Sequence, residues 1–372
     1  MKNYYEMNYK EIGIEFGREL YKSVNQTQHE NQFQELWQRC RDFGIFQFAT
    51  EVYRDPEKIT NIMDLMYGIG VGLETMSIMF SVNVHLWAFI DPIQCFASQQ
   101  LKDTMLKSFC DGSKIGGHAI SENLAGSDVF NLSTTYEKTD DGYILNGSKN
   151  YVTNAPYADT YIVYAREKGT KGFRSISCFL IDKNLSGFCV GGLIHKMGMQ
   201  MSPMASIYMK NCFVEKKYLL GREGQGMGIF NYTMSMERPL LLAFQVGIME
   251  AQLTRNVDFC KQRKQSGRAI IENQSISNRI ADMAVKFEAS KLLLKEIADQ
   301  LKNKKNTYYM SSVAKLFISE SLVANSLDSM RNMGTLGYMT EYQNEQQLRD
   351  SLGSLFYSGT SDIQRNIISS MI

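Results

Sequence analysis

Two residues far apart in the chain have the chemistry of a proton-transfer site. Glu237 is followed directly by Arg238, and Ser358 is followed by a Gly-Thr pair. A carboxylate can remove a carbon-bound proton, whereas the neutral hydroxyl of a serine cannot. The neighbours of Glu237 are largely apolar, namely Met234, Met236, Leu240, Leu241 and Phe244. Because an unpaired carboxylate is costly to bury there and burial raises its pKa, Glu237 is the candidate base; the alternative is a surface ion pair.

Other titratable residues are weaker candidates. Glu122, Glu250 and Glu341 are rival carboxylates, and Glu122 is better interpreted as structural. His85 and His118 are expected to be packed or hydrogen-bonded rather than catalytic. The chain has only four histidines, at spacings that do not suit a zinc site, so no metal is expected.

The composition limits the classes of protein to which this chain can belong. The chain has 372 residues, of which 44% are hydrophobic and 21% charged, as in globular proteins. Its net charge of +1 gives no reason to expect a nucleic-acid or membrane partner. The N-terminal residues have no apolar signal core, and no long apolar run suggests a membrane span. Seven scattered cysteines without a CxxC pair indicate a reduced, cytoplasmic protein.

The pattern of the chain predicts helices, then strands, then helices. Helical periodicity dominates the first part, strand-forming residues dominate the middle, and long helical stretches return near residue 226. We therefore expect an α+β protein with a helical domain over residues 1–114, a β domain over 115–224 and a helical domain over 225–372. This order differs from the alternating pattern of a doubly wound sheet, and no GxGxxG motif follows a strand.

Local signals refine this prediction. Residues 64–85 follow one helical pattern, and residues 240–260 and 276–301 predict long helices. Asp141-Gly142 and Asn146-Gly147 are two successive tight-turn signals in the β region.

Two stretches of the β region could lie against a bound group. Residues 118–128 read His-Ala-Ile-Ser-Glu-Asn-Leu-Ala-Gly-Ser-Asp, and the Ala-Gly-Ser end lets the backbone approach an anion closely. Residues 149–155 read Lys-Asn-Tyr-Val-Thr-Asn-Ala and offer an aromatic face for stacking. Taken alone, the first is a turn-rich loop and the second an ordinary half-buried strand.

Three more stretches lie in the C-terminal half. Residues 263–267 read Arg-Lys-Gln-Ser-Gly, and Gln274 follows them. A guanidinium suits a pyrophosphate, although such a cluster alone is usually a solvated turn. Residues 333–338 read Met-Gly-Thr-Leu-Gly-Tyr, and residues 356–365 read Phe-Tyr-Ser-Gly-Thr-Ser-Asp-Ile-Gln-Arg.

The order and spacing of these stretches resemble the acyl-CoA dehydrogenase superfamily over roughly residues 118–365. The resemblance implies an N-terminal helical domain, a middle β-barrel or sandwich, a C-terminal four-helix bundle, and FAD as cofactor. It implies that Thr153 reaches flavin N5, and that Arg263 and Gln274 serve the FAD of a neighbouring subunit. The residues implied to bind the cofactor are His118, Ile120, Ser121, Ser127, Tyr151, Val152, Thr153, Arg263, Gln265, Gln274, Arg331, Gly334, Thr335, Thr360 and Asp362.

The same resemblance explains why a glutamate stands at position 237 and a serine at position 358. Many members carry the catalytic glutamate at the position of Ser358, whereas isovaleryl and long-chain members carry it before an arginine on another helix, as at Glu237. The implied reaction is α,β-desaturation of a thioester, in which Glu237 removes the α-proton and the β-hydrogen leaves as hydride. The Ser358 N–H and an FAD ribityl hydroxyl would bind the enolate oxygen. The implied substrate contacts are Ser127, Ser358 and Gly359.

Within the superfamily, residues 143–147, 153–159, 274–283 and 358–364 are similar to carrier-protein-linked L-prolyl dehydrogenases of pyrrole-containing natural products. We therefore expect an FAD-dependent enzyme of antibiotic-type biosynthesis that oxidises an aminoacyl thioester on a carrier protein. One alternative is a short- or branched-chain acyl-CoA dehydrogenase. The other is a flavin-binding homologue that has lost catalysis.

The resemblance also predicts partners. Electrons would leave through an electron-transfer flavoprotein or directly to oxygen. The shared FAD site implies a homodimer or homotetramer. A basic rim around the substrate tunnel would favour an acidic carrier protein, and Lys102, Lys107 and Lys114 lie in a plausible region.

Overall fold

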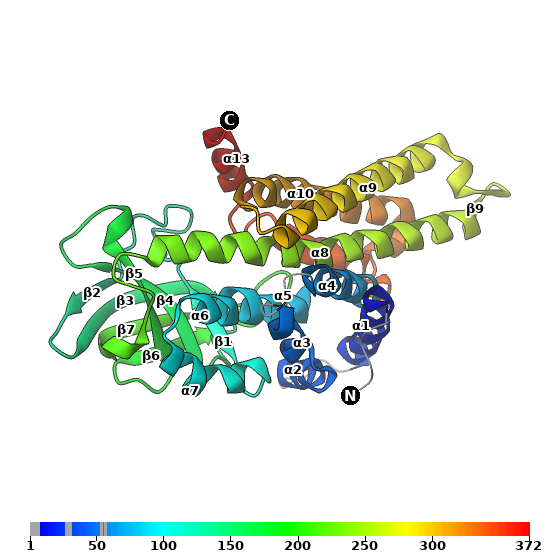
Figure 1. Cartoon of the computed structure of the whole chain (residues 1–372). Coiled ribbons are helices and arrows are strands. Elements are labelled where there is room, and N and C mark those ends of the chain that lie inside the picture. Colours follow the sequence, from blue (N-terminus) through cyan, green and yellow to red (C-terminus); the bar gives the residue numbers. More distant parts are fainter. Residues whose placement is uncertain (1–7, 27–31, 53–54, 56–57) are drawn as a thin grey trace.

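The predicted order of helices, strands and helices is confirmed (Figure 1). This computed structural model describes residues 8–26, 32–52, 55 and 58–372. The N-terminal helices are α1 (Tyr9–Gln26), α2 (Gln32–Phe43), α3 (Ile45–Val52), α4 (Ile59–Leu73), α5 (Ser77–Asn83), the π-helix η3 (Val84–Ile90), α6 (Asp91–Phe96) and α7 (Gln99–Cys110). In this described part, no helix combines the length and apolar character needed to cross a lipid bilayer.

The helical pattern expected over residues 64–85 is present, but the chain breaks once inside it. Glu74 adopts a left-handed conformation with φ of 59° and caps α4 by donating its N–H to Gly70 O. After α5, the helix widens into the π-helix η3, and Asn83 is the last residue before this change. Apolar periodicity does not detect such a break, because both helices bury similar side chains. Short π-helical segments occur frequently at functional sites.

The middle segment forms one mixed sheet. Its strands are β1 (Gly116–Ala119), β2 (Thr135–Lys138), β3 (Gly142–Thr153), β4 (Thr160–Glu167), β5 (Ile176–Asp182), β6 (Phe188–Leu193), β7 (Met204–Glu215) and β8 (Leu219–Leu220). The order is β6-β7-β3-β2-β4-β5-β8, and β1 pairs with β4. Strands β1 and β2 run parallel to β4, whereas the remaining pairs are antiparallel. The sheet surrounds its own apolar core, which includes Tyr136, Tyr161 and Phe179.

One of the two predicted turns is a bulge. Asp141-Gly142 forms the expected connection between β2 and β3, where Thr139 N donates to Gly142 O. At Asn146-Gly147 the strand β3 instead continues, with a register shift against β7. Gly147 has φ of 146°, and a Cβ there would lie 2.5 Å from the Thr134 hydroxyl. Pairing with β7 on one side and β2 on the other therefore overrides the local turn preference.

The C-terminal segment is built on one helix that spans the molecule. Its elements are α8 (Gly226–Gln262), β9 (Lys264–Gln265), β10 (Arg268–Ala269), α9 (Gln274–Lys302), α10 (Tyr308–Met333), α11 (Thr335–Tyr338), α12 (Asn344–Gly353) and α13 (Ser361–Ser370). Short 3₁₀ turns lie at Phe173–Ser175, Lys216–Tyr218, Ile270–Glu272 and Thr340–Tyr342. Helix α8 runs from the β domain to the β9–β10 hairpin at the opposite end of the molecule (Figure 1). Helices α9 and α10 pack along it, and α13 packs on α10.

Glycines allow α8 to lie close to α4. A Cβ on Gly247 would lie 2.0 Å from Tyr67 O, and one on Gly70 would lie 2.2 Å from Phe244 O. Because backbone fills this space, neither position could carry a side chain without separating the helices. This contact fixes α8 against the N-terminal helices between about two and three turns beyond Glu237.

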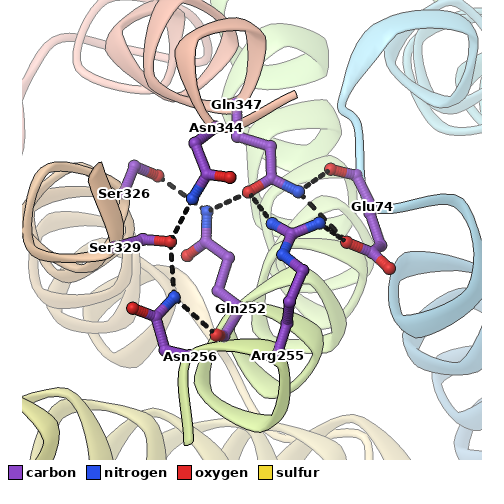
Figure 2. Close-up of polar contacts among 8 residues, drawn as sticks. All are labelled: Glu74, Gln252, Arg255, Asn256, Ser326, Ser329, Asn344 and Gln347. Atoms are coloured by element: carbon purple, nitrogen blue, oxygen red, sulfur yellow. Dashed lines mark hydrogen bonds and ion pairs between the residues drawn. The ribbon is translucent and has the colours of Figure 1, made fainter. Parts of the chain in front are cut away.

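A buried polar network joins the helices at the far side of this contact (Figure 2). Gln347 donates to Glu74 O and accepts from Arg255, and Gln252 donates to Ser326. The network continues through Asn256, Ser329 and Asn344. Such a network stabilises only the arrangement that pairs its groups, so it holds α12 in one position against α4, α8 and α10.

A buried ion pair holds the loop that follows β1. Lys149 donates to Glu122 Oε1 over 2.7 Å and to Ile120 O over 3.0 Å, and both charged side chains are nearly inaccessible to solvent. Burial alone would raise the pKa of Glu122. The Lys149 charge and hydrogen bonds from Ser133 and Thr134 outweigh burial and lower this pKa to about 2. The stabilisation is therefore present above the unfolded-state pKa and is lost as the pH falls toward 2.

Replacing Glu122 with Gln is expected to lower the free energy of unfolding by about 3 kcal/mol, because Lys149 would keep a buried charge without its partner. The exposed pair of Glu137 and Lys168 supplies the control, and Glu137→Gln should cost far less. Urea-induced unfolding measures both variants. Equal losses in the two variants would contradict this account.

Candidate active site

Glu237 lies inside the protein, on the part of α8 that faces α5 and the segment after α12. Its side chain is 2% exposed. The Ser358 hydroxyl donates to Glu237 Oε1 over 2.8 Å, and Asn83 Nδ2 donates to the same oxygen over 3.1 Å. The other oxygen, Oε2, is buried and has no hydrogen-bond partner among the described residues. One carboxylate oxygen is thus held in place while the other is free to accept a proton.

The environment of Glu237 disfavours its charged form. Burial raises the pKa of Glu237 above its ordinary value, while the Ser358 hydroxyl, the charges of Arg238 and Lys315, and Asn83 lower it in part. The net direction is upward. A carboxylate with a raised pKa is a stronger base than one in water, as removal of a weakly acidic carbon-bound proton requires.

Two buried cations hold the segment that carries Ser358. Arg238 Nε donates to Ser358 O over 3.1 Å, and Lys315 Nζ donates to Ser354 O over 2.5 Å. Both cations are almost fully buried. Burial and the neighbouring Arg238 charge lower the pKa of Lys315 to about 7, although Glu237 opposes this shift. The cations therefore fix two carbonyl groups of the segment and lie close enough to Glu237 to influence its charge.

Ser358 presents an unused backbone donor. It has a positive φ of 54°, and Gly359 follows with φ of 90°. Within the described chain, the Ser358 N–H donates to no acceptor, whereas Ser358 O accepts from Arg238 and Gln364. The left-handed turn directs the carbonyl inward to these donors and leaves the N–H available to a bound oxygen.

The two predicted stretches of the β region lie side by side. Asn150 N donates to Ser121 O, and Lys149 Nζ donates to Ile120 O, so the loop of residues 118–128 is fastened to the end of β3. Val152 packs into the sheet core, while Tyr151 on the opposite face is 59% exposed.

Helix α5 connects this strand end to Glu237. Asn154 Nδ2 donates to Ser81 O over 3.0 Å, and two residues later Asn83 reaches Glu237. Thr153, beside Asn154, makes no side-chain hydrogen bond to another described residue. The candidate base and the strand end that carries Thr153 are therefore both hydrogen-bonded, through Asn83 and through Asn154, to the same short helix.

These groups fit FAD and a thioester. Four groups have no partner among the described residues and could meet a ligand: the exposed ring of Tyr151, the hydroxyl of Thr153, the N–H of Ser358 and the buried Oε2 of Glu237. A flat isoalloxazine could stack on Tyr151 and pair with the Thr153 hydroxyl, whereas a thioester could place its carbonyl oxygen at the Ser358 N–H and its α-hydrogen at Glu237 Oε2. Ser127, in the same loop as Ser121, is exposed and available.

Other predicted cofactor residues lie far from Glu237. Arg263 follows Glu237 by 26 residues at the end of α8, which corresponds to about 39 Å along the helix axis. Gln265 lies in the exposed β9–β10 hairpin, and Gln274 begins α9. Arg279 donates to Asn332, which brings the start of α9 beside the end of α10. The members of this distal set are Arg263, Gln265, Gln274, Arg331, Gly334 and Thr335.

Three predicted residues have visible contacts of their own. His118 donates to or accepts from Tyr164 over 3.1 Å and stacks on Phe230, and burial lowers its pKa to about 4. Thr360 caps α13 by accepting from Ile363 N. Asp362 is exposed and pairs with Arg365. The imidazole of His118 thus packs against Tyr164 and against Phe230 of α8. Only the backbone of His118 remains available to a ligand.

Glu237 does not line the open cavity between α8 and the start of α10. This cavity has a volume of about 720 Å³ and is lined by residues including Asn231, Ser235 and Tyr308. Asn231 and Ser235 lie one helical turn apart on α8, whereas Glu237 is two positions beyond Ser235 and points to the opposite side of the helix.

Sequence reasoning missed Asn83 and Lys315. Asn83 is a buried polar residue in the largely apolar helix α5, and that contrast was its one signal in the sequence, whereas Lys315 lies on α10 among other buried polar residues and had no such signal. Their contacts to Glu237 and Ser354 join segments far apart in the chain, which no local pattern encodes.

Two family models match the chain. They are the middle domain of acyl-CoA dehydrogenases over residues 117–212 and the C-terminal domain over residues 224–372. The chain belongs to the acyl-CoA dehydrogenase family. This confirms the predicted family and fold, with FAD as the cofactor of its oxidoreductases.

Individual relatives are similar over nearly their whole length. An L-prolyl-[peptidyl-carrier protein] dehydrogenase of Serratia sp. (strain ATCC 39006) is 33% identical over 90% of this chain and 87% of the relative. The structure of the prolyl acyl carrier protein oxidase AnaB has a TM-score of 0.89 and 33% identity over 97% of this chain and 98% of that one. The structure of PigA with FAD and proline has a TM-score of 0.90 and 30% identity over 98% and 96%.

The buried charge of Glu237 predicts a pH-dependent effect on stability. Because the folded-state pKa is raised, the wild type loses stability as the pH rises from the unfolded-state pKa through the folded-state pKa. Glu237→Gln removes this loss. Its free energy of unfolding relative to wild type should therefore increase as the pH is raised above the unfolded-state pKa of a glutamate, as measured by urea unfolding at a series of pH values. The exposed Glu137→Gln variant is the control, and a difference that does not change with pH would refute the assignment.

Proposed function

We propose that this acyl-CoA dehydrogenase-family protein oxidises a carrier-bound aminoacyl thioester of the L-prolyl type, with Glu237 as base. The observation that carries the proposal is the geometry of Glu237, whose Oε1 accepts from Ser358 and Asn83 and whose buried Oε2 is unpaired. Bound FAD supplies the two-electron acceptor for the hydrogen that leaves the β-carbon as hydride.

The residues of the chain perform the proton transfer. Glu237 Oε2 takes the α-proton of the thioester while Ser358 and Asn83 hold Oε1. The free N–H of Ser358 stabilises the negative charge that develops on the thioester oxygen. Arg238 and Lys315 position that N–H through the carbonyls of Ser358 and Ser354. Tyr151, Thr153 and Ser127 would hold the flavin against this site.

The relatives support the substrate class. The similar protein of Serratia is named for an L-prolyl group on a peptidyl carrier protein, and AnaB and PigA are solved as a prolyl carrier-protein oxidase and with FAD and proline. By analogy, the product here would be an unsaturated pyrrolidine ring in antibiotic-type biosynthesis. Lys102 and Lys107 on α7, and Lys114 after it, are the basic residues proposed to meet an acidic carrier.

The distal set supports a composite FAD site in an oligomer. Arg263 and Gln274 lie too far from Glu237 to serve the same flavin within one chain. In a symmetric dimer, the distal set of one subunit would complete the flavin site of its partner. We propose a dimer or a dimer of dimers in the reduced cytoplasm, with an electron-transfer flavoprotein or oxygen as acceptor.

A short- or branched-chain acyl-CoA dehydrogenase remains the second candidate, because the family as a whole acts on such thioesters and the base geometry would serve both substrates. The two candidates differ in whether the thioester is attached to a folded carrier or to free CoA.

Glu237→Gln is expected to lower the rate of FAD reduction by about 10²- to 10⁴-fold, because the amide cannot take the α-proton. Anaerobic bleaching of the FAD-loaded enzyme by L-prolyl-carrier and acyl-CoA thioesters measures the rate and the substrate class together. Glu250→Gln, on the same helix but paired with Lys10, is the matched control and should bleach at the wild-type rate. Unchanged bleaching in Glu237→Gln would remove Glu237 as the base.

The composite site predicts complementation between two inactive variants. Glu237→Gln and Arg263→Gln homodimers should both be impaired, the first in chemistry and the second in FAD retention. Co-expressed in one cell, they should recover roughly a quarter of the wild-type activity, because half of the dimers are mixed and each mixed dimer has one intact site. A chain carrying both changes, co-expressed with either single variant, should recover none. Equal activity in both experiments would exclude a shared site.

A further inference from the structure

Asn83 has a second polar atom that the contact with Glu237 leaves free. Its Nδ2 donates to Glu237 Oε1 over 3.1 Å, which fixes the orientation of the amide because a carboxylate can only accept. Asn83 Oδ1 is then left buried, and it has no partner among the described residues. Asn83 is fully buried on the last turn of α5, where the π-helix begins.

Asn83 and Glu237 are hydrogen-bonded to each other, and each keeps one acceptor oxygen that has no partner among the described residues. These oxygens are Asn83 Oδ1 and Glu237 Oε2, and both are sealed from solvent. A buried acceptor without a partner costs free energy comparable to a lost hydrogen bond. Glu237 Oε2 is the proposed acceptor of the α-proton, whereas Asn83 Oδ1 has no role in the proton transfer.

An aminoacyl thioester supplies the missing donor. Its amino nitrogen is bonded to the same α-carbon that loses the proton, so an N–H comes close to whatever group lies beside the base. A plain acyl thioester has only a carbon at that position and would leave Asn83 Oδ1 unpaired.

A neutral acceptor suits this position better than a second acid. A carboxylate at position 83 would repel that of Glu237 and raise its pKa further. An amide accepts the hydrogen bond without adding charge, and its N–H₂ group still orients the base.

We propose that Asn83 recognises the amino nitrogen of the substrate and so selects aminoacyl over acyl thioesters. This inference rests on the proposed function. Asn83 Oδ1 accepts a hydrogen bond from the substrate N–H, Glu237 Oε2 faces the adjacent α-hydrogen, and the Ser358 N–H binds the thioester oxygen. Three contacts around one α-carbon also distinguish the L from the D configuration.

The test compares L-prolyl-pantetheine with cyclopentanecarbonyl-pantetheine, which replaces the ring nitrogen by carbon and keeps the ring size. Anaerobic bleaching of the FAD-loaded enzyme gives a rate for each thioester. The wild type should prefer the prolyl thioester, and Asn83→Leu should reduce the ratio of the two rates by about tenfold to a hundredfold. Loss of the hydrogen bond to Glu237 slows both substrates alike and cancels in the ratio.

Ser81→Ala is the matched control. Ser81 also has a buried side-chain oxygen without a partner in the described chain, and it lies on the same helix, but its backbone carbonyl faces Asn154 rather than Glu237. Its rate ratio should equal that of the wild type. A ratio unchanged in Asn83→Leu, or a wild type that oxidises both thioesters equally, overturns the proposal.

A binding measurement separates this inference from the proposed function. L-prolinamide and cyclopentanecarboxamide cannot be turned over as thioesters, and each can be titrated against the flavin spectrum. Prolinamide should bind more tightly to the wild type, and Asn83→Leu should abolish this difference. If neither thioester bleaches the FAD, the proposed function fails, and the two titrations still decide the role of Asn83. If Asn83→Leu does not fold, Asn83→Ala also removes Oδ1 and should likewise abolish the preference for prolinamide; a preference that persists in Asn83→Ala would contradict the proposal.

Discussion

The site depends on one carboxylate that is buried without full compensation. Glu237 is removed from water, and only one of its oxygens is hydrogen-bonded. Burial raises its pKa more than Ser358 and the nearby cations lower it. Such an arrangement costs stability, and it persists because the surrounding packing fixes α8. The contact between Gly247 and Tyr67 and the polar network of Figure 2 supply this packing.

The position of Ser358 follows from the same constraint. Its segment has positive φ at two successive residues, and Arg238 and Lys315 hold its carbonyls from inside. Charged donors form stronger hydrogen bonds than neutral ones, which suits them to fixing an irregular segment. A serine that cannot act as a base therefore keeps two other tasks: its hydroxyl orients Glu237, and its N–H remains available.

Much of the fold could be predicted from the chain alone. The periodicity of residues 240–260 and 276–301 predicts α8 and α9, and the strand-rich texture of the middle segment predicts a β domain. These signals are local, because burial of one helix face or one sheet face repeats within a few residues. The turn at Asn146-Gly147 was wrong, because strand pairing overrides local preference. The helical periodicity over residues 64–85 was correct but did not reveal the break that the left-handed cap at Glu74 makes.

The sequence by itself determined the family, the cofactor and the identity of the candidate base. The order of the motifs and a Glu-Arg pair with apolar neighbours are properties of the linear sequence, so no structure is needed to find them. Only the tertiary structure decided which groups meet that base. Asn83 and Ser358 reach it from α5 and from the segment after α12, and Lys315 on α10 holds that segment through Ser354 O. The separation of Arg263 from Glu237 likewise required the straight course of α8, since distance along a chain becomes distance in space only when the helix is continuous.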